Sequence, residues 1–252
     1  MIYVVLQRMK KLLFLLILTL LLPSCTSKNT RGKEIARAIQ SVGEEYYNAR
    51  NYTAALQNLL EAYKIIDDDP YLNNSLGLTY LAKEKYDLAE GHFKRALKEK
   101  KDFVYAKNNL GAVYMARSQW DMAIQCFEEV LQDLLYPYPE IPFSNIAWAY
   151  FEQKKYKQAG AYFKKSLEVK ADFINPIHGL ASILLETKSY HQTINYLQAE
   201  LKKIPKAAIL HSDLARAYEM INEQAQAKKY WKKVLKLAPA GSPLALEAGK
   251  RL

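Results

Sequence analysis

Histidines, cysteines and acidic side chains are the residues that could carry catalysis or hold a metal ion. The histidines, at positions 92, 178, 191 and 211, show no His-Glu-x-x-His spacing and no other close ligand pair. A glycine-rich phosphate loop and a Gly-x-Ser-x-Gly motif are both absent. Three acids, Asp67 to Asp69, precede Pro70 without further ligands beside them, and they fit a solvated turn before a helix start. The sequence therefore predicts no enzyme, no metal site and no cofactor.

The residue with the clearest predicted chemistry is Cys25. A basic stretch at residues 8–11 is followed by an apolar run at residues 12–22, which is too short to span a bilayer and is typical of a signal peptide. The run ends in Leu22-Pro23-Ser24-Cys25, which resembles the bacterial lipobox, where the cysteine thiol receives diacylglycerol. Pro23 is not the most usual residue at its place. The alternative is an ordinary secretory signal with an incidental cysteine.

Acylation at Cys25 would determine the location of the protein, because several acyl chains anchor a protein stably whereas one does so only marginally. Thr26 follows the cysteine where lipoproteins of the inner membrane typically carry Asp, so the resemblance implies the periplasmic face of the outer membrane. The predicted parts are a signal peptide at 1–24, a lipidated cysteine with a tether at 25–35, and one domain at 36–252. Met1 and Met9 both remain possible starts. The other cysteine, Cys126, fits a half-buried structural thiol.

The body of the chain is a repeat. Six small residues recur at steps of 34 residues, with a single step of 36: Gly43, Gly77, Gly111, Ala147, Ala181 and Ala215. The third residue after each is an aromatic in five of the six units: Tyr46, Tyr80, Tyr114, Tyr150, Leu184 and Tyr218. The sixteenth is always bulky and apolar: Leu59, Phe93, Phe127, Phe163, Leu197 and Trp231. Such a period indicates a solenoid, in which each unit buries its apolar face only by stacking on its neighbours.

This pattern resembles the tetratricopeptide repeat from residue 36 to about residue 240. The predicted fold is therefore all-α, a right-handed solenoid of six helix-turn-helix repeats with no second domain. The small residue lets the two helices of a pair lie close together. At the end of the array, Ser242 and Pro243 predict the start of a short capping helix over residues 244–252.

The charge of the chain is compatible with several partners. The formal net charge is +10, but basic residues alternate with Glu and Asp along the helices, which argues against nucleic acid. In the tetratricopeptide-repeat family, the first helices of successive pairs line a groove that binds other proteins. That resemblance assigns a protein-binding groove to eight residues: Asn74, Leu78, Leu81, Asn108, Met115, Trp148, Phe151 and Leu185. Trp148 is expected to contribute most, because large aromatics dominate interface energetics. The alternative is that part of this stripe only packs between helices.

The step of 36 residues inserts two residues between the third and fourth repeats, in a loop that contains Tyr136, Pro137, Tyr138 and Pro139. Six repeats behind a lipobox, with this loop and then Phe143, Asn145 and Ile146, resemble the type IV pilus pilotins PilF, PilW and Tgl. Ala147 departs from them, since they commonly carry Gly there. The resemblance implies a non-enzymatic outer-membrane lipoprotein that promotes localisation and assembly of the secretin, with a secretin subunit as partner. The alternative is a general periplasmic adaptor that recruits substrates to a protease or cell-envelope enzyme.

Overall fold

The computed structural model describes residues 24–252, and side chains from residue 30 onward. Most of the predicted signal peptide and the Cys25 side chain lie outside these described residues. Contacts divide the chain into two compact units, residues 1–109 and 110–252, with the boundary inside one helix. Each unit is described by itself.

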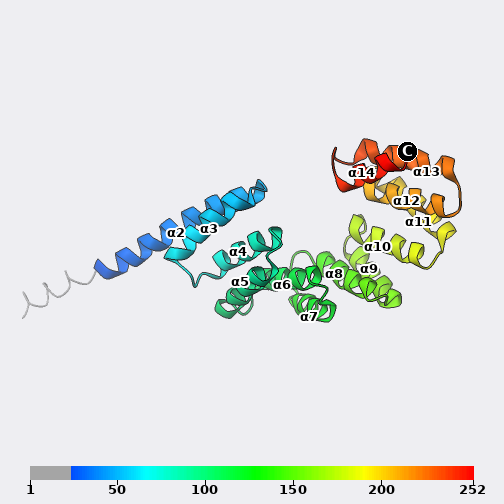
Figure 1. Ribbon diagram of the computed structural model, residues 1–252. Helices are drawn as coiled ribbons and strands as arrows, with labels where there is room; N and C mark the ends of the chain where they lie inside the picture. The colour runs from blue at the N-terminus through cyan, green and yellow to red at the C-terminus, as the bar shows by residue number, and fades with distance from the viewer. Residues whose placement is uncertain (1–23) are drawn as a thin grey trace, which may run out of the picture. The chain divides into compact units, whose positions relative to one another are not determined.

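The described part of the first unit contains two helix pairs and the start of a fifth helix (Figure 1). The helices are α2 (Ser24–Asn48), α3 (Tyr52–Ile65), α4 (Pro70–Ala82), α5 (Tyr86–Glu99) and α6 (Val104–Ala116), the last of which crosses the boundary. The segment 25–35, predicted as a tether, is helical as the first part of α2. Its side chains at positions 33–35 are exposed, and Ala36 is the first buried residue among the described side chains of α2, which begin at residue 30.

The second unit continues the same alternation of helices to the C-terminus (Figure 1). It contains the end of α6 and then α7 (Trp120–Val130), α8 (Glu140–Glu152), α9 (Tyr156–Val169), α10 (Ile174–Glu186), α11 (Tyr190–Lys203), α12 (Ala208–Met220), α13 (Gln224–Leu237) and α14 (Pro243–Lys250). As predicted, Ser242 caps α14 by accepting a hydrogen bond from the backbone N–H of Ala245, and Pro243 is its first residue. This last helix packs on α13 and covers Trp231, Val234 and neighbouring apolar residues. Cys126 is half-buried in α7, as predicted.

The close approach predicted for the small residues is confirmed. A Cβ atom added to Gly77 would lie 2.6 Å from the Phe93 ring, and one added to Gly111 would lie 2.7 Å from the Phe127 ring. Both phenylalanines are fully buried. Because real Cβ atoms do not approach other atoms so closely, only glycine allows the two helices of these pairs to pack at this distance.

Each first helix of a pair ends in the same left-handed turn. The residue after the turn donates its N–H to the carbonyl of the recurrent aromatic position, as Lys85 does to Tyr80 at 2.9 Å and Lys155 to Tyr150 at 2.9 Å. This six-to-one bond, with a residue of positive φ before it, is the Schellman motif. The positive-φ residues are not glycines, and they recur with the period of the repeat: Arg50, Glu84, Ser118, Lys154, Lys188 and Asn222. The hydrogen bonds therefore stabilise this turn, and it forms without a glycine at the positive-φ position.

The start of α4 shows what the three consecutive acids do. Asp69 caps the helix, because its Oδ1 accepts the backbone N–H groups of Tyr71 at 2.8 Å and Leu72 at 3.0 Å. The buried Asn73 donates its Nδ2–H to the carbonyls of Asp67 at 2.8 Å and Asp69 at 3.0 Å. Among the described residues no group of three or more His, Cys, Asp or Glu side chains could hold a metal ion. Of the three acids, Asp69 is thus the one whose side chain serves the helix start.

His92 makes the first unit sensitive to acid. Its Nδ1 lies 2.9 Å from Asn73 Oδ1, and its ring stacks on Tyr80 at 5.4 Å. Burial, with the nearby Arg95 as a smaller cause, lowers the pKa of His92 from 6.5 to about 4. The unfolded chain therefore takes up a proton near pH 6.5 that the folded chain takes up only near pH 4, so stability falls as the pH is lowered between these values.

We expect the first unit to lose about 1 kcal/mol of stability through His92 between pH 7 and pH 5, after allowing for solvent screening of this half-buried group. His92→Gln keeps a donor for Asn73 but has no charge to gain, so its stability should fall less over this interval. Urea unfolding at both pH values measures the difference. The same pH dependence in both proteins would contradict the assignment.

Candidate protein-binding groove

A groove in the second unit is formed by the first helices of repeats four, five and six. It has a volume of about 640 Å³. Trp148 and Phe151 of α8 line one side, Leu185 of α10 lines the centre, and Met220 of α12 lines the far side. Three of the predicted groove residues, Trp148, Phe151 and Leu185, therefore lie in one site. These residues come together because the repeat places equivalent positions of successive first helices side by side.

Trp148 is held in place by the fold. Its ring lies 5.2 Å from Phe151, 5.3 Å from the fully buried Phe163 and 5.4 Å from His178, between ring centroids. Its Nε1–H donates to Asn175 Oδ1 at 3.2 Å. The side chain is half-buried, so it takes part in the packing between helices as well as lining the groove. The packing between helices is thus observed, while the role of Trp148 in binding stays a prediction, and removal of this side chain is expected to lower stability.

A network of ion pairs forms the far wall of the groove. Arg216 of α12 pairs with Glu247 of α14 at 2.7 Å, and Arg251 pairs with Glu219 at 3.0 Å. Glu219 also accepts the Nε1–H of the buried Trp231 at 2.8 Å. These bonds join α12 to the C-terminal segment and leave Met220, which is 58% exposed, as the apolar side chain of this wall. The rim is charged while the floor is apolar, as in the core and rim of protein interfaces.

A buried carboxylate joins two of the groove helices. Asp213 is completely buried on α12, and its Oδ2 lies 2.6 Å from Nδ1 of His178 on α10. Arg216 approaches the other oxygen at 3.7 Å. Removing the partner of a buried polar group is costly, because the remaining group then lacks the hydrogen bond that replaces water. This contact therefore fixes α10 against α12 and keeps the groove in shape.

The remaining predicted groove residues do not belong to this site. Asn74 and Leu78 line a smaller hollow of about 280 Å³ in the first unit, beside Glu44 and Tyr47. Asn74 is also engaged, because its Oδ1 accepts a hydrogen bond from Asn109 at 3.0 Å. The other three are half-buried and line neither hollow: Leu81, Asn108 and Met115.

The loop between α7 and α8 buries one of its predicted residues and exposes another. Tyr136 is buried at 8% exposure, whereas Tyr138 is half exposed. Leu134 and Leu135, which precede the Tyr-Pro residues in the same junction, are 95% and 90% exposed. Asp133 sets this turn by accepting the N–H of Leu135 at 2.9 Å. Two adjacent apolar residues beside an insertion are a sequence signal for an exposed apolar surface. The Tyr-Pro pattern next to them is more conspicuous and was the basis of the predicted loop site.

Sequence reasoning also missed Tyr190, Arg216, Met220 and Arg251, which line the groove. Tyr190 begins the second helix of its pair, and Arg251 lies beyond the last repeat. An alignment of first-helix positions therefore could not include these two residues. Arg216 occupies an aligned first-helix position of the sixth repeat, to which the predicted groove did not extend, and Met220 lies one residue beyond the last aligned position of that helix.

The fold and this groove define the class of the protein. Two family models, each described as tetratricopeptide repeat, match residues 43–100 and 102–172, together about half of the chain. The chain belongs to the tetratricopeptide-repeat proteins, which are scaffolds that bind protein partners. The predicted all-α repeat fold is confirmed. Within residues 24–252, the helices lack the combination of length and apolar character needed to cross a bilayer.

Solved structures give a more particular likeness. The structure from a functional characterisation of Pseudomonas aeruginosa PilF is 23% identical, with a TM-score of 0.67, and the match covers 88% of this chain and 100% of that chain. PilW, described as a widely conserved type IV pilus biogenesis factor, is 20% identical with a TM-score of 0.72, covering 84% of this chain and 97% of that one. A tetratricopeptide-repeat protein from Parabacteroides merdae is 18% identical with a TM-score of 0.68, covering 86% and 85%. No curated protein matches the sequence. The predicted likeness to PilF and PilW is thus present, and at these identities it concerns the fold.

Proposed function

We propose that this chain is a lipid-anchored scaffold on the periplasmic face of the outer membrane, and that it promotes assembly of the type IV pilus secretin. The observation that carries the proposal is the groove of Trp148, Phe151, Leu185 and Met220, an apolar floor inside a charged rim. The fold that it shares with PilW, a type IV pilus biogenesis factor, supports the choice of partner. The lipobox-like sequence at Cys25 supports the location.

The anchor and the groove have separate tasks in this proposal. Acyl chains on Cys25 hold the scaffold at the membrane, which raises the local concentration of the groove where the secretin must assemble. The groove covers an apolar segment of the secretin subunit before that segment is buried in the ring. The scaffold needs no catalytic group, because burial of apolar surface and release of the subunit into a larger interface are sufficient.

A deletion experiment tests the partner. Cells that lack this chain should lose heat-resistant secretin multimers on gels and surface pili, while the secretin monomer is still made. Expression of the wild-type chain from a plasmid should restore both. Normal multimers in the deletion strain would contradict the secretin proposal and favour the general periplasmic adaptor.

The anchor is tested separately with Cys25→Ser. We expect this protein to move from the outer-membrane fraction to the soluble periplasmic fraction, because it can no longer be acylated. Its helical circular dichroism spectrum should be unchanged, since the buried residues that hold α2 in the fold, among its described side chains, begin at Ala36. A Cys25→Ser protein that still sediments with outer membranes would show that the anchor lies elsewhere.

A further inference from the structure

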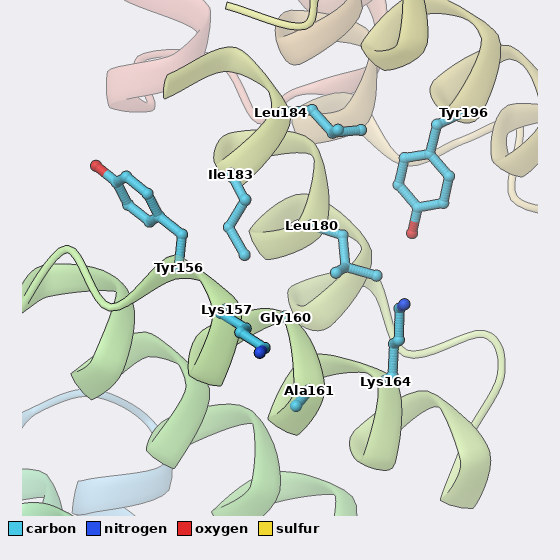
Figure 2. Close-up of a pocket in the computed structure, with 9 residues that line it drawn as sticks. All are labelled: Tyr156, Lys157, Gly160, Ala161, Lys164, Leu180, Ile183, Leu184 and Tyr196. Atoms are coloured by element: carbon cyan, nitrogen blue, oxygen red, sulfur yellow. The ribbon is translucent and has the colours of Figure 1, made fainter. Parts of the chain in front are cut away.

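A second cavity lies in the second unit, outside the groove. It has a volume of about 550 Å³ and is formed by α9, α10 and the middle of α11 (Figure 2). Leu180, Ile183 and Leu184 of α10 give it an apolar wall. It shares no lining residue with the groove, so the two sites are separate in the molecule.

The first cause of the cavity is a glycine. Gly160 follows Ala159 in α9, and the equivalent positions of the third and fifth repeats carry Ile124 and Ile194, which are each only 7% exposed. A Cβ atom added to Gly160 would meet only Ile183 Cδ1, at an ordinary contact distance of 3.8 Å. The fourth repeat therefore lacks the side chain that its neighbours bury at this position.

The second cause is the one break in the recurrent aromatic position. In the second, fourth and sixth repeats, that tyrosine pairs with the ring twelve residues later: Tyr80 with His92 at 5.4 Å, Tyr150 with Tyr162 at 5.6 Å, and Tyr218 with Tyr230 at 5.6 Å. The first and third repeats have no ring at that later position. In the fifth repeat, Leu184 takes this place, and the ring twelve residues later is Tyr196.

Tyr196 therefore has neither a ring partner nor a hydrogen bond. Its ring makes no aromatic contact within residues 30–252, and its buried hydroxyl has no hydrogen-bond partner. Burial raises the pKa of this phenol. A buried polar group without a partner costs free energy, which a ligand with an acceptor atom can recover once the side chain turns toward it. Figure 2 shows this hydroxyl and the Lys164 ammonium directed toward one another at one side of the cavity.

Two lysines give the cavity its charge. Lys157 and Lys164 of α9 line it, both are exposed, and neither is within ion-pair distance of an acidic side chain in the described part of the chain. Seven residues of helix separate them by about 10 Å along the axis, at 1.5 Å per residue. Three residues of an extended segment in the polyproline II conformation span about the same distance, at about 3.1 Å per residue, and its turn of three residues brings the first and fourth side chains to the same face.

We propose that this cavity, opened by Gly160 and Leu184, binds an extended segment of a partner protein in which two bulky apolar residues lie between two acidic residues. The apolar side chains enter the space beside Ile183 and Leu184. The two carboxylates pair with Lys157 and Lys164. This site is independent of the groove and of the proposed role in secretin assembly. An experiment can therefore contradict one proposal without contradicting the other.

The test is a binding titration in which the full chain, in detergent, is added to a fluorescein-labelled peptide. The peptide contains Glu-Leu-Phe-Glu between neutral residues. We expect saturable binding to the wild type that weakens as salt is raised, because exposed ion pairs are screened. Gly160→Ile should fill the cavity and weaken binding at least tenfold. The double variant Lys157→Gln with Lys164→Gln should weaken peptide binding and remove most of its salt dependence. Lys202→Gln replaces an exposed lysine outside the cavity and is the matched control, which should bind the peptide as the wild type does.

Two further variants and one further probe distinguish peptide binding in this cavity from peptide binding in the groove and from lipid binding in the cavity. Leu184→Tyr should provide the aromatic pair with Tyr196 and also weaken binding, while Met220→Asp in the groove should leave it unchanged. Absence of binding to the wild type, or equal binding to Gly160→Ile, would overturn the proposal. Loss of peptide binding in the groove variant would assign the peptide to the groove and would also overturn it. Binding of phosphatidylglycerol vesicles instead of the peptide, lost in Gly160→Ile, would replace the protein segment with a lipid.

Discussion

Gly179→Ala is expected to destabilise the second unit by about 2 kcal/mol, which for a unit of this size lowers the melting temperature by about 4–8 °C. A Cβ atom at Gly179 would lie 2.1–2.5 Å from three ring atoms of Phe163. Phe163 is fully buried and has Trp148 at 5.3 Å on another side, so the ring has no space to retreat. The strain from overpacking therefore exceeds the gain of up to about 1 kcal/mol that alanine brings to a helix.

Gly160→Ala is the matched control, because Gly160 lies in α9 of the same unit and its added Cβ meets nothing closer than 3.8 Å. We expect it to stabilise the unit by up to about 1 kcal/mol. Thermal unfolding followed by circular dichroism measures both variants. If the two substitutions shift the melting temperature in the same direction, the packing assigned to Phe163 and Gly179 is wrong.

The second large effect is expected for partner binding. Met220→Asp combined with Phe151→Ala removes one apolar side chain from each side of the groove and adds a charge to its floor. Truncation of central apolar anchors costs about 2 kcal/mol or more, which is about a thirtyfold loss of affinity. Met122→Asp is the control, because Met122 is exposed on α7, outside the groove. The measurement is retention of the secretin subunit by the tagged chain from solubilised outer membranes, with melting temperatures to verify folding.

Trp148 is not used in that comparison, although the sequence indicated it as the main binding residue. Its ring packs on Phe163 and its Nε1–H bonds to Asn175, so Trp148→Ala would lower stability and binding together. Equal retention of the partner by the groove variant and by the Met122→Asp control would move the binding site out of this groove.

The repeat could be predicted from the sequence because it is a one-dimensional pattern. Gly77 and Gly111 recur with the period, and the bulky residues opposite them recur with the same period, so the close helix pairs follow directly. The C-terminal helix was predictable for a similar reason, since Ser242 and Pro243 are local signals for a helix start. Local and periodic signals specify these elements without knowledge of the tertiary contacts.

The residues that line the groove were less predictable, because contacts between different repeats bring them together. Arg251 enters it from beyond the last repeat, and Met220 from one residue beyond the aligned positions of the first helices. The burial of Tyr136 and the exposure of Leu134 and Leu135 depend on how the loop folds back, which its composition does not determine. The two departures from the repeat, Gly160 and Leu184, are visible in the sequence, yet only the structure brings them to one cavity.

The measurement that tests the central claim most directly is site-specific photo-crosslinking in living cells. A benzoyl-phenylalanine placed at Met220, which is 58% exposed in the groove, should give a crosslinked product that contains the secretin subunit. The same probe at Leu235, which is 41% exposed on α13 and outside the groove, should give none. A secretin crosslink from position 235 without one from position 220 would contradict the assignment of this groove as the partner-binding site.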